Sequence, residues 1–397
     1  MKTILLRFLF AAACCATVLA ALAPEAGAVP VFARKYGFSC NMCHSGFPRL
    51  NDFGVRYRRN GYRLPGREGE ERTVLQGHSP VALRASAGYN YDRFHNSSGV
   101  TVRQFQLNGV DLLSGGLLSR DAGYIFVYVP EVAGSGGVAA QTGTLEMASV
   151  VFPELGTPWL NLRVGRFEPA YAAFSAKRHL SFSPYEAYDF GFKGGAPFSD
   201  TREGVEVTGH GRGFGYAAGV INAPSPAGSS QTSSDFYARA EKVFGEGEGQ
   251  TAGYKVGLTG YAGRARPDAS LPPYSRRGYA RAGLDASLNY LNLNLSLQYL
   301  NGTDDKTLWG RTRDLTYSAG FAELSYFPSV SLTCFARYDE VGGPRSAGAQ
   351  IGRWTLGGRY YPADNVAVHP EYSFRKQGQP GGAATEAFFT ARVDFAF

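Results

Sequence analysis

The feature that most constrains the fold is an alternation of polar and apolar residues that recurs from residue 80 to residue 397. In one segment, for example, Leu293, Leu295 and Leu297 are separated by single asparagine or serine residues. A period of two is typical of β-strands whose two faces meet different environments. Soluble β-sandwiches alternate in the same way, so the pattern alone predicts strands and leaves the class of β-protein open.

Three properties of these segments favour a closed membrane barrel. They number about sixteen and run for roughly nine to twelve residues each, and several end in aromatic residues, as strands do at membrane interfaces. Their connections alternate between short turns and longer stretches rich in Gly, Ser and Pro, which is typical of periplasmic turns and outside loops. The segments begin near residues 80, 101, 118, 144, 158, 203, 212, 234, 252, 276, 290, 314, 329, 350, 364 and 386. The sequence therefore predicts an all-β protein, an antiparallel transmembrane β-barrel of about 16 strands.

The longest connection lies between Phe167 and Arg202 and carries Lys177, Arg178, His179 and several aromatic residues. Connections of this length are usually functional or disordered. We expect this one to fold into the lumen and constrict it, and a surface loop is the alternative.

The pentapeptide Cys40-Asn41-Met42-Cys43-His44 is the strongest chemical motif in the chain. Two thiols at this spacing add to the vinyl groups of a haem, and the histidine beside them becomes an axial ligand of the iron. Zinc half-sites and disulfides use the same cysteine spacing, but a disulfide would leave His44 without a role. The motif predicts one covalent haem c, attached through Cys40 and Cys43 and ligated by His44.

The start of the chain indicates the compartment. Residues 1–28 have a basic beginning, an apolar run and a small-residue cleavage site at Ala26-Gly27-Ala28, as in a signal peptide. Haem attachment of this type takes place outside the cytoplasm, so export and the motif agree. Beyond residue 28 no run of about 18 apolar residues occurs, and no membrane-spanning helix is expected.

Residues 29–79 are expected to form a small haem-bearing segment ahead of the barrel at 80–397. Leu50, Phe53 and Tyr57 have helical spacing, which predicts a short helix from Pro48 to a stop at Gly61. A segment of about fifty residues buries little core unaided, so a haem would supply it. The side chains expected to pack around the haem are Tyr36, Phe38, Phe47, Phe53 and Tyr62. The haem propionates are expected near Arg56, Arg58 and Arg59. The alternative is that these arginines form a solvated basic face of the helix and have no role at the haem.

The residues leave the second axial ligand open. Met42 lies inside the motif, and Met147 is the other methionine of the mature chain. His78, in a Gly-His-Ser-Pro turn, is the nearest candidate. A solvated loop histidine and an open sixth position are the alternatives.

The motif has recognisable neighbours: Phe-Ala-Arg-Lys-Tyr-Gly at 32–37, Phe-Pro-Arg-Leu at 47–50, Phe-Gly at 53–54 and Asn-Gly-Tyr at 60–62. This pattern resembles the amino terminus of the fused cytochrome–porin family, whose members include outer-membrane iron oxidases. In the barrel, the stretches 164–167 and 201–205 are similar to phosphate-selective porins. The resemblance implies the outer membrane of a bacterium, haem attachment at Cys40 and Cys43, His44 as the proximal ligand, and electron transfer across the membrane.

The leading functional hypothesis is therefore a redox conduit. A haem on the periplasmic side of a bilayer core about 30 Å thick could not serve an outside donor, so the haem segment is expected to enter the barrel as a plug. Extracellular Fe(II) or another donor or acceptor and a periplasmic cytochrome are the expected partners. The chain is then an electron-transfer protein, and an iron(II) oxidase is the enzymatic form of the same hypothesis.

Two rival functions stay open. The first is an anion-selective, phosphate-type porin in which the haem segment is structural or regulatory, favoured by the formal net charge of +7 and by arginines expected on the lumenal face. Those arginines are Arg103, Arg163, Arg337 and Arg392. The second rival is a peroxidase-like haem enzyme with an open sixth position. A nucleic-acid partner is not expected because the basic residues are spread out, and both a monomer and a trimer are compatible with the barrel.

Overall fold

The computed structural model describes residues 31–67, 70–77, 81–95, 99–131, 143–190, 200–223, 234–245, 253–265, 277–305, 314–344, 350–363, 365–379 and 382–396. The expected signal peptide at 1–28 and the ligand candidate His78 lie outside these ranges. No helix within them is long and apolar enough to span a membrane.

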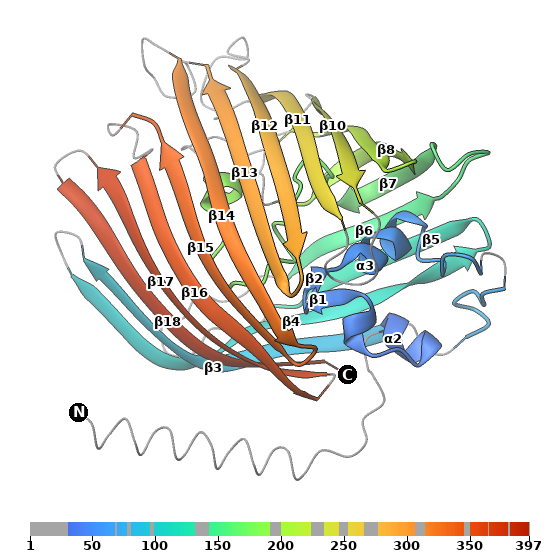
Figure 1. Ribbon diagram of the computed structural model, residues 1–397, viewed down its shortest axis with the longest axis horizontal. Helices are drawn as coiled ribbons and strands as arrows, with labels where there is room; N and C mark the ends of the chain where they lie inside the picture. The colour runs from blue at the N-terminus through green and yellow to red at the C-terminus, as the bar shows by residue number, and fades with distance from the viewer. Residues whose placement is uncertain are drawn as a thin grey trace.

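Sixteen antiparallel strands in the described ranges form a closed barrel, because the last strand, β18, pairs with the first, β3 (Figure 1). The first half of the barrel contains β3 (Val81–His95), β4 (Val100–Ser119), β5 (Ala122–Val129), β6 (Thr144–Phe152), β7 (Asn161–Phe167), β8 (Arg202–Gly211), β9 (Phe214–Asn222) and β10 (Ser234–Phe244). The second half contains β11 (Tyr254–Ala265), β12 (Arg277–Tyr290), β13 (Leu293–Asp304), β14 (Leu315–Ser329), β15 (Leu332–Gly342), β16 (Gln350–Ala363), β17 (Val366–Gln379) and β18 (Gly382–Ala396). The predicted fold class is confirmed. The strands are more uneven in length than expected, from 7 residues in β7 to 20 in β4.

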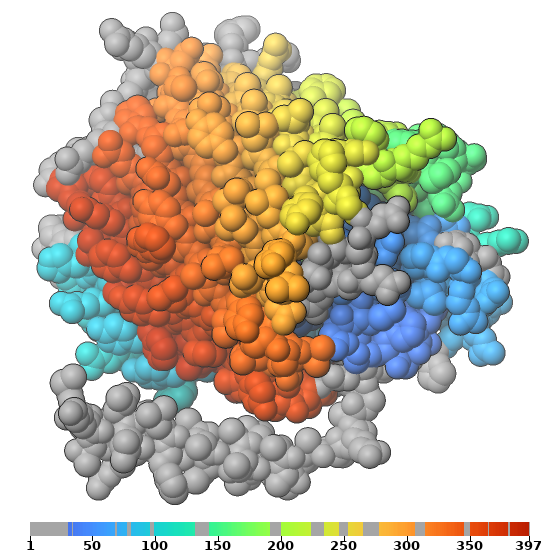
Figure 2. Space-filling model, in the orientation of Figure 1, coloured from blue at the N-terminus to red at the C-terminus, as the bar shows by residue number. Residues whose placement is uncertain are grey.

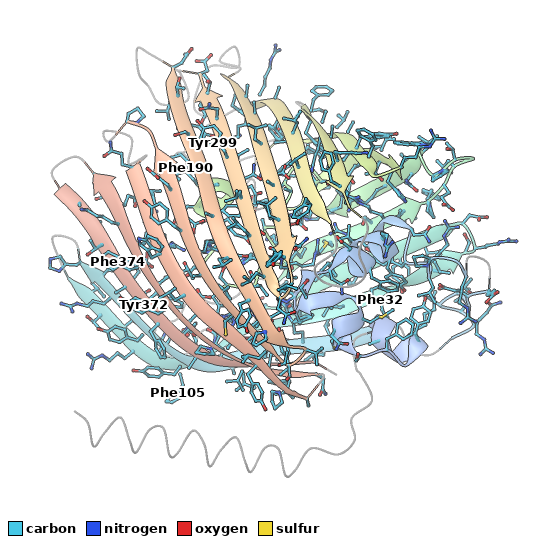
Figure 3. All side chains as sticks on the ribbon, viewed as in Figure 1. Phe32, Phe105, Phe190, Tyr299, Tyr372 and Phe374 are labelled. Carbon is cyan, nitrogen blue, oxygen red and sulfur yellow. The ribbon has the colours of Figure 1, made fainter. Side chains whose placement is uncertain are left out.

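The two faces of the strands have the polarity that a membrane barrel requires. In β13 the polar residues Asn294, Ser296 and Gln298 are buried, whereas Leu293 and Tyr299 are exposed. Exposed aromatic residues such as Phe105 and Tyr372 lie on the outer surface (Figure 3). An inward polar face and an outward apolar face are the reverse of a soluble protein and suit a barrel surrounded by lipid.

One predicted lumenal arginine is misplaced. Arg103 is exposed and shares its face of β4 with Phe105, and its guanidinium lies over the Tyr91 ring. The inward residues there are the hydrogen-bonded Gln104, Gln106 and Asn108. The prediction was wrong because β4 carries polar residues on both faces near Arg103. A single arginine there does not indicate which face points into the lumen.

The N-terminal segment lies in the lumen near one end of the barrel. It consists of α2 (Val31–Tyr36), a 3-10 turn η1 (Cys40–Met42), β1 (His44–Gly46), β2 (Arg49–Leu50) and α3 (Asp52–Arg59). Figure 1 shows these elements gathered beside β4 to β6, and Figure 2 shows the same residues in blue against the strand ends. The segment lies at the end of the barrel that carries the short turns. Its Phe47 carbonyl accepts a hydrogen bond at 3.0 Å from the hydroxyl of Tyr361, which lies just before the short β16–β17 turn.

The expected helix is present but starts later than predicted. Asn51, not Pro48, sets its beginning, because the Asn51 side chain accepts a hydrogen bond from the Gly54 N–H at 2.9 Å. The predicted stop at Gly61 is confirmed: its φ of +64° is the left-handed conformation that glycine tolerates.

The described part of the connection between β7 and β8, residues 168–190 and 200–201, folds into the lumen, as predicted. Its short helix α4 (Glu186–Asp189) contacts β14 and β15, and the side chains of Phe167, Leu180 and Tyr188 are almost fully buried. The N-terminal segment and the described part of this inward loop therefore both lie inside the barrel.

Candidate functional site

Residues 40–44 form a tight turn held by one asparagine. The Cys43 N–H donates to the Cys40 carbonyl at 3.3 Å, and the Asn51 side-chain amide donates to the carbonyls of Asn41 and Met42 at 3.2 and 3.0 Å. Asn51 also donates its own backbone N–H to the Cys43 carbonyl at 2.9 Å. The residue that caps α3 therefore also fixes the motif, so the helix and the two cysteines have one defined relative position.

Gly54 is the reason why α3 can approach the motif so closely. A Cβ atom at this position would lie 2.2 Å from the Cys43 carbonyl oxygen, well inside van der Waals contact. Only glycine fits this contact without a shift of the helix or of the turn. Glycine at position 54 is thus explained by the motif and not by helix propensity.

The motif opens onto a cavity between the N-terminal segment and the barrel wall. All five aromatic residues expected around a haem line this cavity, together with Cys40, Cys43 and His44. The barrel side presents the apolar residues Leu113 on β4, Ile125 and Val127 on β5 and Met147 on β6, beside the acidic residues Asp111 on β4 and Glu146 on β6. The cavity is therefore built by two parts of the chain that lie far apart in sequence.

Four basic side chains also belong to the lining of this cavity. Arg58 on α3, Arg84 on β3, and Lys177 and Arg178 on the inward loop all line it. The predicted Arg59 instead forms an ion pair with Glu241 at 2.8 Å and does not line the cavity. Sequence reasoning missed Arg84, Lys177 and Arg178 as lining residues because only the closed barrel brings them to the motif.

The chemistry of these groups fits a c-type haem. No disulfide joins Cys40 to Cys43 in the described part of the chain. Burial lowers the pKa of His44 to about 4, so its imidazole is neutral at pH 7 and has a lone pair for iron. The described residues contain no group of three or more His, Cys, Asp or Glu placed to hold a metal ion. Two thiols, a neutral imidazole, an apolar cavity and nearby cations are the set that a covalently held, anionic haem requires.

A second, polar cavity lies in the lumen beside the first. Its lining contains seven basic side chains, Arg49, Arg58, Arg59, Arg163, Arg178, Arg239 and Lys255, and three acidic ones, Asp52, Glu206 and Glu241. Several of these arginines are ion-paired, for example Arg163 with Glu206 and Arg239 with Asp285. The pairing reduces the positive field that the count of basic residues would imply.

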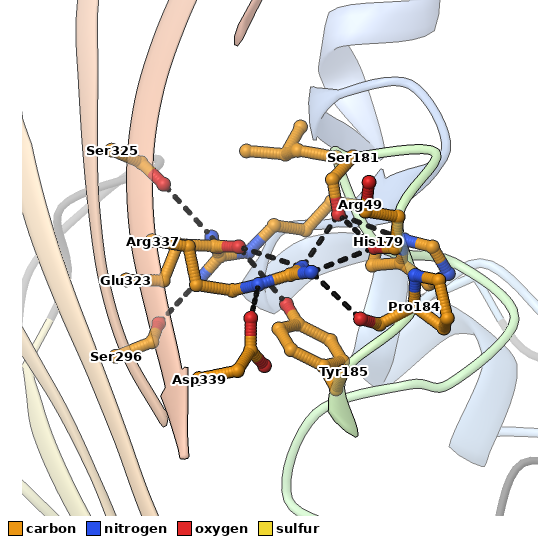
Figure 4. A network of polar contacts seen from close by, with 12 residues as sticks. Arg49, His179, Ser181, Pro184, Tyr185, Ser296, Glu323, Ser325, Arg337 and Asp339 are labelled. Carbon is orange, nitrogen blue, oxygen red and sulfur yellow. Dashed lines mark hydrogen bonds and ion pairs between the residues drawn. The ribbon is translucent and has the colours of Figure 1, made fainter. Parts of the chain in front are cut away.

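Arginines of the barrel wall hold the inward loop (Figure 4). Arg337 on β15 donates to the Ser181 hydroxyl and to the carbonyls of Ser183 and Pro184, and it pairs with Asp339. Arg353 and Arg375 both pair with Glu186 of α4, at 2.7 and 2.6 Å. The predicted lumenal positions of Arg163, Arg337 and Arg392 are confirmed, since Arg163 pairs with Glu206 and Arg392 lies over the Phe182 ring of the loop.

Glu168 accepts hydrogen bonds from Ser175 and Lys177 at the start of the inward loop. Its ionisation is expected to make the docking of this loop depend on pH. Burial alone would raise its pKa, but Arg178 and Arg58 outweigh burial and lower the pKa from 4.5 to about 2. A carboxylate with a lowered pKa stabilises the docked loop above pH 4.5, and this contribution disappears as the pH falls towards 2. The shift corresponds to about 3 kcal/mol. In planar bilayers, brief open-channel events should become more frequent between pH 4.5 and pH 3.

Glu168→Gln is the matched variant for this prediction. It should show frequent openings already at pH 7 and little further change on acidification, because the amide cannot titrate. An identical pH response in the wild type and the variant would assign the effect to another group.

Comparisons with known proteins bear on the barrel. No protein-family model and no curated protein matches the chain. Among solved structures, an anion-selective porin from Comamonas acidovorans aligns with a TM-score of 0.59 at 14% identity, covering 80% of this chain and 99% of that one. The barrel has the porin fold. OmpF from Salmonella typhi, solved in complex with daunomycin, aligns with a TM-score of 0.58 at 12% identity over 80% of this chain and 97% of its own.

A third neighbour is a trimeric form of OmpT from Vibrio cholerae, with a TM-score of 0.53 at 11% identity, covering 80% of this chain and 99% of that one. These identities are low enough that the likeness shows the fold alone. The resemblance of the barrel to porins is confirmed at this level. The finer resemblances, to phosphate-selective porins and to the fused cytochrome–porin family, stay predictions.

Proposed function

We propose that this chain is an outer-membrane protein that transfers electrons between the two sides of the membrane by means of one haem c in its lumen. The observation that carries the proposal is the cavity that joins Cys40, Cys43 and His44 to the apolar wall of β4 to β6 inside a closed barrel. A haem that carries electrons across the membrane has to lie within a membrane-spanning structure such as this barrel. A cytochrome that works only in the periplasm needs no barrel around it. The porin fold supports the outer-membrane part of the proposal.

Each residue of the site has a role in this function. Cys40 and Cys43 bind the cofactor covalently, and His44 presents a neutral nitrogen to the iron. The aromatic residues exclude water, which reduces the solvent reorganisation that accompanies a change of charge. The haem, when bound, supplies a reversible one-electron couple. The expected acceptor is a periplasmic cytochrome, and extracellular Fe(II) is one proposed donor, which would make the chain an iron(II) oxidase.

The proposal can be tested with the haem-loaded protein in liposomes. Fe(II) or a membrane-impermeant reductant is added outside, a membrane-impermeant oxidant is enclosed, and both the haem spectrum and the enclosed oxidant are followed by stopped flow. We expect rapid reduction of the haem and then of the oxidant, and loss of both in His44→Ala. No transfer to the enclosed oxidant from any outside reductant would overturn the proposal. Transfer from the reductant but not from Fe(II) would remove only the iron oxidase form.

A second candidate function is an anion pathway through the polar lumenal cavity. The excess of basic over acidic residues in that cavity favours it, and one structural neighbour is an anion-selective porin. Current in planar bilayers distinguishes the two functions. The N-terminal segment and the inward loop should keep the current of an electron conduit small, whereas an anion porin should pass a large, anion-selective current.

A further inference from the structure

Among the described side chains that line the cavity beside the motif, one is a thioether. Met147 on β6 is only 6% exposed and lines the cavity that also holds Cys40, Cys43 and His44. Lys177 lines it too, but pairs with Glu146 at 3.5 Å. The hydroxyl of Tyr36 donates to Glu71, and its oxygen lies 3.3 Å from that of Tyr57. Among the described lining residues, Met147 therefore offers iron a soft donor that needs no deprotonation.

Met147 lies on the inward face of β6 with Ser149 and Val151, and a local irregularity of the strand brings Glu146 to the cavity beside it. Met147 pairs with Val127, but the next pair is Leu145 with Tyr128, so Glu146 is an extra residue on β6. Such a bulge re-aims side chains and often lies beside functional sites. Here it lets two consecutive residues, Glu146 and Met147, line the same cavity, which regular alternation would not allow.

The surroundings of Met147 do not explain a methionine by packing alone. Its neighbours Leu113, Ile125 and Val127 form an apolar patch in a lumen whose inward face is elsewhere largely polar. Aliphatic side chains fill such a patch equally well, and the whole chain has only three methionines. The other methionine near the motif, Met42, is 41% exposed and does not line the cavity.

We propose that the thioether sulfur of Met147 is the second axial ligand of the haem iron. The inference rests on the haem of the proposed function and adds that the iron links the N-terminal segment, through His44, to the barrel wall. Methionine and histidine together give a haem c a higher reduction potential than two histidines do. The barrel itself then helps to set the potential of the carrier it encloses.

The test uses the full haem-loaded chain in detergent micelles, with four variants. Met147→Leu should lose the weak long-wavelength charge-transfer band of a sulfur-ligated ferric haem, lower the reduction potential and bind carbon monoxide at least tenfold faster when reduced. Met147→His should remain six-coordinate without that band, which shows that the site still folds. Met42→Leu and His78→Ala should both keep the wild-type spectrum and potential.

The outcomes separate this inference from the proposed function. The assignment of Met147 is overturned if Met147→Leu keeps the spectrum and reduction potential of the haem-loaded wild type. It is also overturned if Met42→Leu loses the sulfur band. If the wild-type haem shows a histidine-ligated spectrum that changes in His78→Ala, the second ligand is His78 and the assignment of Met147 is wrong. Loss of the band in Met147→Leu supports the assignment even if the liposomes show no electron transfer, in which case only the proposed function fails.

Discussion

Replacing Arg49 with methionine is expected to loosen the N-terminal segment from the barrel wall. One guanidinium nitrogen of Arg49 donates to Glu323 at 3.0 Å and Ser325 at 3.2 Å, and the other donates to Asn294 at 2.7 Å and Ser296 at 2.8 Å. Removing it leaves the fully buried Glu323 carboxylate without this cation. Breaking a buried ion pair from one side costs about 3 kcal/mol, which raises the undocked population about 150-fold.

The effect should appear as current and as a change at the haem. Arg49→Met should show frequent open-channel events in planar bilayers and a less homogeneous haem spectrum, because the segment that moves carries the motif. Other contacts, such as the ion pair of Arg63 with Glu154 at 2.9 Å, should keep the segment mostly docked. Among the described residues, Glu323 then keeps only Arg337, at 3.8 Å, as a cation partner, so the double variant Arg49→Met with Glu323→Gln should recover part of the loss by removing the buried carboxylate.

Arg67→Met is the matched control. Arg67 belongs to the same segment, but its side chain is 66% exposed and pairs with Glu70 at the surface, where an ion pair contributes little. It should leave both current and spectrum unchanged. Equal currents in Arg49→Met, Arg67→Met and the wild type would show that Arg49 does not hold the plug.

Much of the barrel could be predicted from the sequence because a strand exposes its residues alternately to two media. Observed strands begin within a few residues of every predicted start, as with Val81 against 80 and Gln350 against 350. The pattern fails where both faces of a strand are mixed, and Arg103 is the example. It also fails to give strand length, since nothing local in sequence marks the long β4 (Val100–Ser119).

The motif half of the site could be predicted, and the barrel half could not. Cys40, Cys43 and His44 have the spacing that covalent haem attachment would require, and the aromatic residues near them are close in sequence. Met147 and Arg84 reach the cavity only through strand register and barrel closure, and Glu146 reaches it only through the bulge. A single methionine in an alternating strand gives no signal until its neighbours in space are known.

The largest effect on the inward loop is expected from Arg337→Met. Arg337 is fully buried, donates three hydrogen bonds to loop residues 181–184 and pairs with Asp339 on its own strand. The variant removes the loop contacts and leaves a buried carboxylate unpaired, at a cost of about 3–5 kcal/mol. We expect a lower thermal unfolding temperature and longer-lived open-channel events than in the wild type.

Two control measurements test whether the effect is specific to Arg337. Arg375→Met removes a similar cation facing the same loop, but Arg353 still pairs with Glu186, so its effect should be much smaller. The haem content of Arg337→Met should match the wild type, because Arg337 does not line the cavity of the motif, although Lys177 and Arg178 of the loop do. The inward loop and the N-terminal segment would then be two separate barriers in one lumen. If Arg337→Met and Arg375→Met behave alike, the loop is held by its buried aromatic residues and not by the arginine at its centre.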